Sequence, residues 1–297
     1  MISIIVVTKN NRLTIKNVLK STRKFAEKYK TELIVVDGKS QDGTYETARK
    51  FLEAYSSPFV RTALLQDPGI SLSYARHIGY THSKGDIVIF LDGDTILSNT
   101  FIEKFETVMR SDYDVIIPSF TIFSIDKATR IFNYTFNIIE RTSVNLKKSS
   151  IIQPARIFTR RILEQLHGYP PLSRYFGEDR IVTALAMLKT SKIAYMPELK
   201  IIKIDDPTLA AYIKKHTRYG KGIQRDLTPT AKQLLKDYII ARRATYINLV
   251  LPAISTMYAM YAFHTLKSMS DSLQIFAMKY VIDLSMLLGE LKSLIRK

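Results

Sequence analysis

The sequence predicts an α/β fold in which a mostly parallel sheet is flanked by helices and followed by a helical C-terminal region. Short apolar runs alternate with helical patterns through the first two hundred residues, which is typical of βαβ units. One run, residues 87–91, is continuously apolar, as buried parallel strands are. Toward the C-terminus the pattern changes to longer apolar segments, so we expect two domains, residues 1–225 and residues 226–297.

Each strand expected in the first domain is an apolar or β-branched run bounded by polar or turn residues. These runs cover residues 2–7, 32–36, 60–65, 87–91 and 115–118. Helical spacing of apolar residues predicts helices over residues 12–29, 44–55, 71–82, 99–109 and 181–189, with Ser98 or Asn99 capping the fourth. Residues 151–161 indicate a strand that leads into a helix. Residues 120–148 are rich in aromatic and β-branched side chains without a clear period, and we expect an irregular or helical excursion there.

The composition excludes several classes of protein. The chain has 297 residues, of which 46% are hydrophobic and only 11 are Gly and 10 Pro, so collagen-like and disordered chains are excluded. It has no Cys, which excludes a disulfide framework, a thiolate zinc site and a cysteine nucleophile. The net charge of +17 predicts polyanionic partners. From residue 207 onward the chain has 14 basic and 5 acidic residues, and the same region holds its most apolar stretch. This combination favours an anionic membrane over nucleic acid as the partner.

The C-terminal region has the features of a membrane-associated segment. Residues 231–245 form an amphipathic pattern suited to a lipid interface, and residues 246–266 carry no charge over 21 positions, a length that can span a bilayer. The alternative is a soluble helical hairpin that packs on the first domain or forms a homo-oligomer, because residues 273–289 include Lys279 and Asp283. The basic residues before position 246 predict a cytoplasmic first domain. The apolar run at the N-terminus is too short for a signal peptide.

Polar side chains follow the predicted strands, and ligands of open parallel sheets bind at such strand ends. Thr8 and Asn10 follow the first strand, and Gly69 follows the third. The run Asp92-Gly93-Asp94 follows the fourth strand and is the sharpest signal. Two carboxylates around a glycine place hard oxygen ligands within reach of one divalent ion, which also takes diphosphate oxygens. The alternative is a turn in which Asp and Gly serve the backbone geometry.

Three further positions have a functional and a structural interpretation. Asp37, after the second strand, can accept hydrogen bonds from a nucleobase or ribose, or can form an Asx-turn. Arg76 lies on the helix after Gly69 and can direct its guanidinium at phosphate, or can be an ordinary surface residue. The pair Glu178-Asp179 begins a helix, where a carboxylate stays ionised and can act as a general base, or can simply complement the helix dipole.

Together these features resemble family 2 glycosyltransferases of the GT-A fold, which is Rossmann-like, over roughly residues 1–222. The matching parts are the first strand with Thr8 and Asn10, residues 35–44 as the nucleoside-binding loop, residues 75–79 as the Ala-Arg-Asn-x-Gly helix, residues 84–94 as the strand into the Asp-x-Asp motif, residues 158–169 before the acceptor site, and residues 177–179 as the Glu-Asp motif of the catalytic base. Six ordered matches are far more specific than any single one.

The resemblance implies an inverting transfer from a UDP- or GDP-sugar to an acceptor hydroxyl or phosphate. It implies that Asp94 and Asp92 hold Mg²⁺ or Mn²⁺ and that Asp179, beside Glu178, deprotonates the acceptor. The residues then expected to bind the donor nucleotide are Thr8, Asn10, Asp37, Gly69, Arg76, Asp92 and Gly93. Asp37 is expected to recognise the base, and Arg76 to offset the charge of the leaving diphosphate.

Several positions depart from the family pattern. His77 replaces the usual Asn, Gly38 stands where many members have a second Asp, and the His often found near residues 203–205 is missing. Residues 217–222 are similar to the basic loop of the family, in which Arg218 or Lys221 is expected to contact diphosphate. There is no Q-x-x-R-W motif, which favours the addition of a single sugar over processive synthesis.

The leading hypothesis is a glycosyltransferase at the cytoplasmic face of a membrane, with a lipid-linked phosphate or glycan as acceptor. One alternative is a soluble transferase that acts on protein or free glycan. Another is a non-catalytic basic protein that binds nucleic acid or another polyanion, supported by the charge, 17 Tyr and 14 Phe. The aromatic residues do not interleave with the basic ones, so nucleic acid is not expected as a partner.

Overall fold

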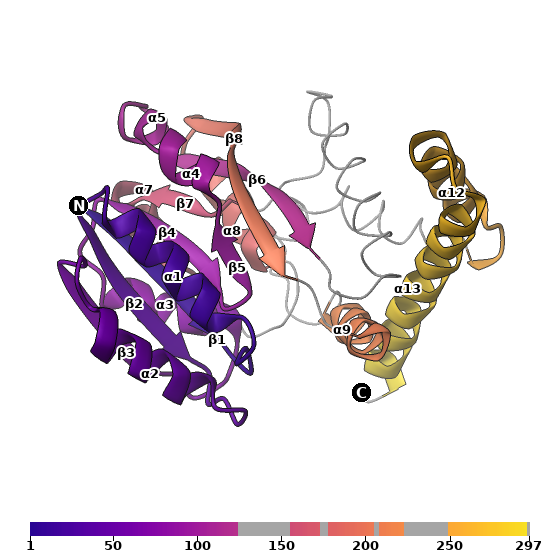
Figure 1. The fold of residues 1–297 in the computed structure, drawn as a ribbon, viewed down its shortest axis with the longest axis horizontal. Helices are drawn as coiled ribbons and strands as arrows, with labels where there is room; N and C mark the ends of the chain where they lie inside the picture. The colour runs from indigo at the N-terminus through magenta and orange to yellow at the C-terminus, as the bar shows by residue number, and fades with distance from the viewer. Residues whose placement is uncertain (124–154, 173–177, 205–207, 223–248, 296–297) are drawn as a thin grey trace. The chain divides into compact units, whose positions relative to one another are not determined.

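The computed structural model describes residues 1–123, 155–172, 178–204, 208–222 and 249–295 (Figure 1). They belong to two compact units. The first holds the described residues of Met1–Thr121 and Gln153–Ile204, and the second holds those of Ile122–Ile152 and Asp205–Lys297. Each unit is considered by itself below.

The first unit is built on a mixed sheet. The strands that the structure describes are β1 (Ile2–Thr8), β2 (Thr31–Asp37), β3 (Arg61–Gln66), β4 (Ile87–Asp92), β5 (Thr95–Leu97), β6 (Val115–Phe123), β7 (Ile157–Thr159) and β8 (Ile193–Ile204), in the order β3-β2-β1-β4-β7-β6-β8-β5. The four strands from β3 to β4 pair in parallel. Beyond β4 the pairing becomes antiparallel, between β4 and β7, β7 and β6, and β8 and β5. The parallel half carries the strand ends at which ligands of such sheets bind.

The helices of this unit cover both faces of the sheet. They are α1 (Ile15–Ala26), α2 (Thr44–Tyr55), α3 (Leu72–Thr81), α4 (Asn99–Lys104), α5 (Glu106–Met109), α7 (Arg160–Gln165) and α8 (Glu178–Met187). Two of them begin at serine caps, because Ser71 Oγ accepts the Tyr74 N–H at 3.1 Å and Ser98 Oγ accepts the Phe101 N–H at 3.0 Å. These caps fix where α3 and α4 begin.

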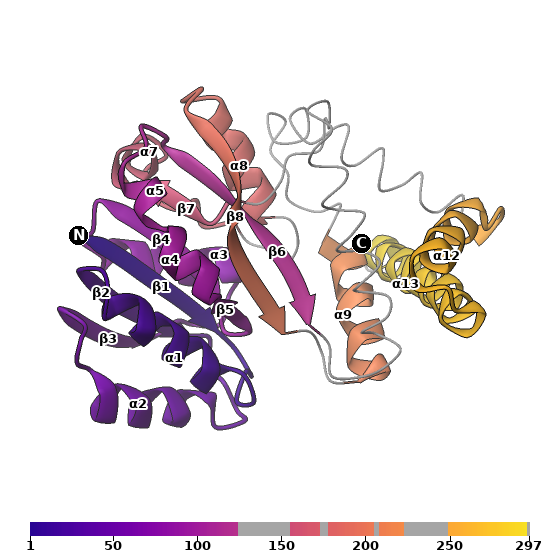
Figure 2. The same ribbon diagram turned by 45° about the horizontal axis from the view of Figure 1, so that its top comes forward.

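Side chains that alternate along the strands build two cores. Ile4 and Val6 of β1 belong to one cluster, with residues of α1, α2 and α4, whereas Ile5 and Val7 belong to the other, with residues of α3, α7 and α8. Figures 1 and 2 show α1 and α2 on one face of the sheet and α3 on the other. A strand buried on both faces needs apolar side chains at every position, which is why β1, β2 and β4 stand out in the sequence.

The predicted α/β architecture is confirmed. All five predicted strands are present, and the helix predicted over residues 44–55 has those bounds. The helix predicted over residues 99–109 is two helices, α4 and α5, which meet at Phe105. The strands β5 and β8 were not predicted. The excursion expected over residues 120–148 begins with the end of β6 at Phe123, and the rest lies outside the described residues.

The described helices of the second unit are α9 (Leu209–Gly222), α12 (Ala253–Leu266) and α13 (Met269–Ile295). Both α9 and α12 pack against α13. The uncharged stretch of residues 246–266 is not one helix, because its described part starts with a turn and becomes helical only after Pro252, which fits a helix start since it has no N–H to satisfy. The 14 residues of α12 rise about 21 Å, less than the roughly 30 Å of a bilayer core.

One helix within the described residues is long and apolar enough to cross a membrane. It is α13, in which Met269–Lys292 has a mean hydropathy of 1.3 and half of the most apolar window is buried. Its Lys279 and Asp283 are buried and form an ion pair one turn apart. The amphipathic segment expected over residues 231–245 lies outside the described residues.

Candidate active site

The register of the parallel strands brings the predicted donor-site residues to one edge of the sheet. Thr8, at the end of β1, lies opposite Asp37 of β2, and the neighbouring Val7 lies opposite Asp92 of β4. Asp37 in turn lies opposite Gln66, at the end of β3. Carboxylates from strands on either side of β1 therefore share this edge with the loops that follow the strands.

The loops after β1 and β2 hold each other through Asn10. Its backbone N–H donates to Ser40 Oγ at 2.8 Å, and its side-chain Oδ1 accepts the Gln41 N–H at 2.9 Å. Asn10 has φ of 55°, a left-handed conformation that Asn tolerates better than most residues. In the structure Asn10 therefore connects the loop after β1 to the loop after β2, next to Asp37.

Asp37 is fully buried and only half satisfied. Its Oδ2 accepts the Ser40 N–H at 2.9 Å, as in an Asx-turn. Its Oδ1 is buried, and it has no hydrogen-bond partner within the part of the chain that the structure describes. An unpaired buried oxygen is costly, so a ligand N–H or O–H in reach of Asp37 would be bound favourably.

The two predicted glycines of the site are dictated by backbone geometry. The Gly93 N–H donates to Val7 O at 2.8 Å, and a side chain at position 93 would meet Thr8 and Asn11. Gly69 has φ of 78°, and its N–H donates to the buried Asp67. Both glycines let a turn pass close to a neighbouring strand end.

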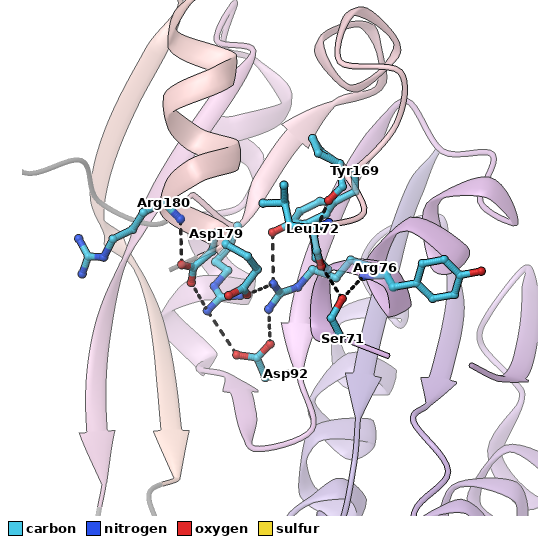
Figure 3. Close-up of polar contacts among 12 residues, drawn as sticks. Ser71, Arg76, Asp92, Tyr169, Leu172, Asp179 and Arg180 are labelled. Carbon is cyan, nitrogen blue, oxygen red and sulfur yellow. Dashed lines mark hydrogen bonds and ion pairs between the residues drawn. The ribbon is translucent and has the colours of Figure 1, made fainter. Parts of the chain in front are cut away.

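Arg76 lies at the centre of a buried ion network (Figure 3). It projects from α3 and is only 1% exposed. Its guanidinium donates to Asp92 at 2.5 Å, to Glu178, and to the Tyr169 hydroxyl at 3.2 Å. The sequence analysis expected this guanidinium to face phosphate. In the structure it holds the Asp92 carboxylate, at the end of β4, next to the acidic pair that begins α8.

A second buried arginine joins the network from the residue before β7. Arg156, which directly precedes β7, donates through Nη2 to Asp92 at 3.3 Å and to Asp179 at 3.2 Å. Asp179 also accepts the N–H of Arg180 at 2.9 Å, and its side chain is 18% exposed. Of the two predicted catalytic acids, Asp179 is therefore the one with access to solvent, since Glu178 is only 7% exposed.

The pKa values of Asp92 and Glu178, two acids of this network, are shifted in opposite directions. Burial alone would raise the pKa of Asp92, but the charges of Arg156, Arg76 and Lys203 outweigh it and hold that pKa well below its usual range. Burial raises the pKa of Glu178, and the charge of Asp179 adds to this while Arg76 opposes it. Asp92 is therefore a firm anion, whereas Glu178 is an acid whose ionised form is favoured mainly by its pairing with Arg76.

Asp94 stands apart from the arginines. Its Oδ1 accepts the Thr95 hydroxyl at 3.1 Å, its Oδ2 lies 3.5 Å from Lys203 Nζ, and its side chain is 22% exposed. The described residues contain no group of three or more His, Asp and Glu side chains arranged around a common point. A cation at this turn would therefore draw most of its ligands from a substrate and water, as Mg²⁺ does when it is bound with phosphates.

The structure thus brings together Asp92, Asp94, Arg76, Glu178 and Asp179, with Thr8, Asn10, Asp37, Gly69 and Gly93 along the same sheet edge. Arg218 and Lys221 lie in α9, in the second unit, and their side chains are outside the described residues.

Three side chains of the network were not predicted from the sequence: Arg156, Lys203 and Tyr169. Arg156 was the easiest to find, because a charged residue among Ala155, Ile157 and Phe158 has to pair with an acid once that strand is buried.

Comparisons with known proteins bear on the family to which the chain belongs. Residues 3–167, more than half of the chain, match the family model described as glycosyl transferase family 2. The glycosyltransferase AglE of Haloferax volcanii is 27% identical over 172 residues, which cover 57% of this chain and 56% of that protein. The undecaprenyl-phosphate 4-deoxy-4-formamido-L-arabinose transferase of Pseudomonas savastanoi pv. phaseolicola is 27% identical over 121 residues, 39% of this chain and 34% of that protein. The matching part thus spans little more than half of one relative and a third of the other.

A solved structure shows the same fold. The mannosyltransferase PcManGT of Pyrobaculum calidifontis, in complex with GDP-Man and Mn²⁺, superposes with a TM-score of 0.64 at 16% identity, over 100% of this chain and 87% of that chain. At this identity the likeness concerns the fold alone. The family model begins in β1, runs past the Asp92-Gly93-Asp94 turn and ends just after α7. This match carries the assignment: the chain belongs to glycosyl transferase family 2.

Proposed function

We propose that this chain is an inverting glycosyltransferase that moves one sugar from a nucleotide-diphospho-sugar to an acceptor hydroxyl or phosphate. One observation carries the proposal: Arg156 Nη2 lies 3.3 Å from Asp92 and 3.2 Å from Asp179. The guanidinium of Arg156 thus bridges the Asp92 carboxylate, at the sheet edge to which we assign the donor, and the partly exposed Asp179 carboxylate on α8. Such a site can bind an activated sugar and deprotonate an alcohol at neighbouring positions.

The donor nucleotide, UDP or GDP, is assigned to the edge formed by β1, β2, β3 and β4. Asp37 offers its unpaired Oδ1 to an N–H of the base or a hydroxyl of the ribose. The turns that contain Asn10, Gly69 and Gly93 line this edge, and Thr8 lies close to Gly93. Arg76 contributes through Asp92, whose position and charge it fixes.

A divalent cation, Mg²⁺ or Mn²⁺, fits this edge through Asp94. The Asp94 carboxylate is a hard oxygen donor with access to solvent, whereas both oxygens of Asp92 already accept arginine hydrogen bonds. We therefore assign direct contact to Asp94 and an electrostatic contribution to Asp92. When bound, the cation would supply positive charge to the diphosphate.

The transfer step uses Asp179. Its carboxylate takes the proton of the acceptor hydroxyl, whose oxygen attacks the anomeric carbon from the side opposite the diphosphate. The bond from that carbon to the diphosphate oxygen breaks, and the nucleoside diphosphate leaves with both electrons of that bond. Attack from the opposite side inverts the anomeric configuration. Glu178, beside Asp179, is bound to Arg76 and serves to position that arginine.

The donor assignment is tested by measuring thermal stability with UDP, GDP, UDP-sugars and GDP-sugars, each with and without Mn²⁺. A ligand that binds the folded state raises the melting temperature, and the rise grows with the logarithm of its concentration relative to its dissociation constant. We expect one nucleotide to stabilise the protein and Asp94→Asn to remove the part of the shift that depends on Mn²⁺. A panel in which no nucleotide shifts the melting temperature contradicts the proposed function.

We further propose that the acceptor is lipid-linked or at an anionic membrane, reached from the cytoplasmic face through residues 226–297 as a separate membrane-associated region. The support is the length and apolarity of α13, the basic C-terminal third, and a relative named for undecaprenyl phosphate, a polyprenyl lipid phosphate. Pairing of two copies through these helices is part of the same proposal.

Fractionation of cells without detergent tests the membrane proposal. We expect the chain to sediment with membranes at low salt and to remain there at high salt, because an apolar helix resists the screening that releases surface charge. Recovery in the supernatant at both salt concentrations favours a soluble transferase acting on protein or free glycan.

A further inference from the structure

The segment of residues 168–172, which follows α7, is fastened along α3. The Ser71 hydroxyl donates to Leu172 O at 2.6 Å (Figure 3). The Ser73 hydroxyl donates to Pro170 O and accepts the Leu172 N–H at 3.1 Å. Both serines are buried, and the residues that they bind are 97 to 101 positions away in the sequence. Side chains of one helix thus satisfy the backbone groups of a distant segment.

The same segment brings the Tyr169 hydroxyl to Arg76. His77 Nδ1 donates to Tyr169 O at 2.9 Å, and Gly168 turns at φ of 96° beside the His77 ring, where a Cβ would lie 3.2 Å from that ring. The Tyr169 hydroxyl then accepts from Arg76 Nη1 at 3.2 Å, and its ring meets Phe90 edge to face with centroids 4.7 Å apart. The position of this buried hydroxyl is therefore set by the segment that α3 holds.

These contacts place α3 between the donor edge and the acids of α8. From this helix Arg76 donates to Asp92 at 2.5 Å and to Glu178, the residue before Asp179. Asp92 is fixed at the end of β4, and Glu178 is fixed at the start of α8. The Tyr169 hydroxyl is the third partner of the guanidinium. A planar guanidinium has one defined orientation only when each of its partners is itself held in place.

We propose that Ser73 and Tyr169 are positioning residues for the base Asp179. This rests on the proposed function. The segment that Ser73 holds carries the Tyr169 hydroxyl, and this hydroxyl directs Arg76 toward Glu178, which adjoins the base. A displacement of about 1 Å at a reacting group can cost about a hundredfold in rate, so a loosened segment should slow proton transfer. Binding of the donor nucleotide, which is assigned to the ends of the parallel strands, should change little.

Hydrolysis of the nucleotide-sugar by the full chain tests this without an identified acceptor. Water gives a proton to the same base, and its oxygen displaces the nucleoside diphosphate from the anomeric carbon. Release of UDP or GDP gives kcat and KM, and calorimetry gives the affinity for that nucleotide with Mn²⁺. We expect Ser73→Ala and Tyr169→Phe each to lower kcat about tenfold or more, and to change KM and the affinity by less than about twofold. The double variant should lose no more than the larger single loss, because both changes act through one hydroxyl.

Ser3→Ala is the matched control for the loss of a buried hydroxyl. Ser3 is fully buried, donates to Glu32 at 2.6 Å and accepts the Gly85 N–H at 2.7 Å, but it lies near the start of β1, away from the site. It should lower the melting temperature and leave kcat unchanged. Normal kcat in both Ser73→Ala and Tyr169→Phe, or a loss confined to nucleotide affinity, overturns the inference and leaves the proposed function intact. If no nucleotide stabilises the unmodified protein, the proposed function itself is overturned.

Discussion

Replacing Asp179 by Asn is expected to lower kcat for sugar transfer by about a hundredfold to ten-thousandfold, the usual contribution of a general base. The amide keeps the size of the side chain and can still meet the Arg180 N–H, which Asp179 accepts at 2.9 Å. It cannot take a proton from the acceptor. Because donor and acceptor binding do not need that proton transfer, KM for the donor should change little, and the loss should lie in kcat.

The measurement is a steady-state transfer assay with the nucleotide-sugar identified by the thermal-shift panel. Asp112→Asn is the matched control, since Asp112 is 85% exposed and pairs at the surface with Lys192. It should have normal kcat. If Asp179→Asn binds the donor normally and turns over at the normal rate, Asp179 is not the base, and the link between α8 and the chemistry is lost.

The fold was predictable where burial produces a recognisable local pattern of apolar residues. The strands β1, β2 and β4 are apolar at successive positions because helices cover both faces, and this leaves a continuous run that no surface strand shows. The strand β8 escaped prediction for the converse reason. It contains Pro197, its exposed positions alternate irregularly with buried ones, and its pairing with β5 joins residues a hundred positions apart.

The site was predictable only in part, because the type of a residue indicates which chemistry it can perform but not which residues it contacts in the folded chain. Asp92, Glu178 and Asp179 stood out as carboxylates at strand and helix ends. That Arg76 would be buried against two of them, 16 and 102 positions away, depends on tertiary packing that one sequence does not show. Arg156 and Lys203 were missed for the same reason, since each meets Asp92 across more than 60 positions.

Replacing Arg76 by Met is expected to cost about 3 to 5 kcal/mol of unfolding free energy, as when one partner of a buried ion pair is removed. Arg76 is 1% exposed and is bound to both Asp92 and Glu178, so its loss takes a hydrogen-bond donor from the buried Glu178 and from Asp92, which is 14% exposed. Arg49→Met is the matched control. Arg49 is 44% exposed and pairs with Glu46 and Glu53 on α2, where such pairs contribute less than about 1 kcal/mol.

Urea unfolding followed by circular dichroism measures both variants, and pH separates charge from packing. In the unmodified protein the pKa of Asp92 is depressed, so its stabilising contribution is present above the ordinary pKa of about 4 and is lost as the pH falls. The deficit of Arg76→Met should therefore shrink below about pH 4. Adding Glu178→Gln to Arg76→Met should recover part of the lost stability at neutral pH, because it removes one unpaired charge while keeping the volume. A deficit that is independent of pH and unaffected by the second substitution would mean that Arg76 stabilises the fold by packing alone.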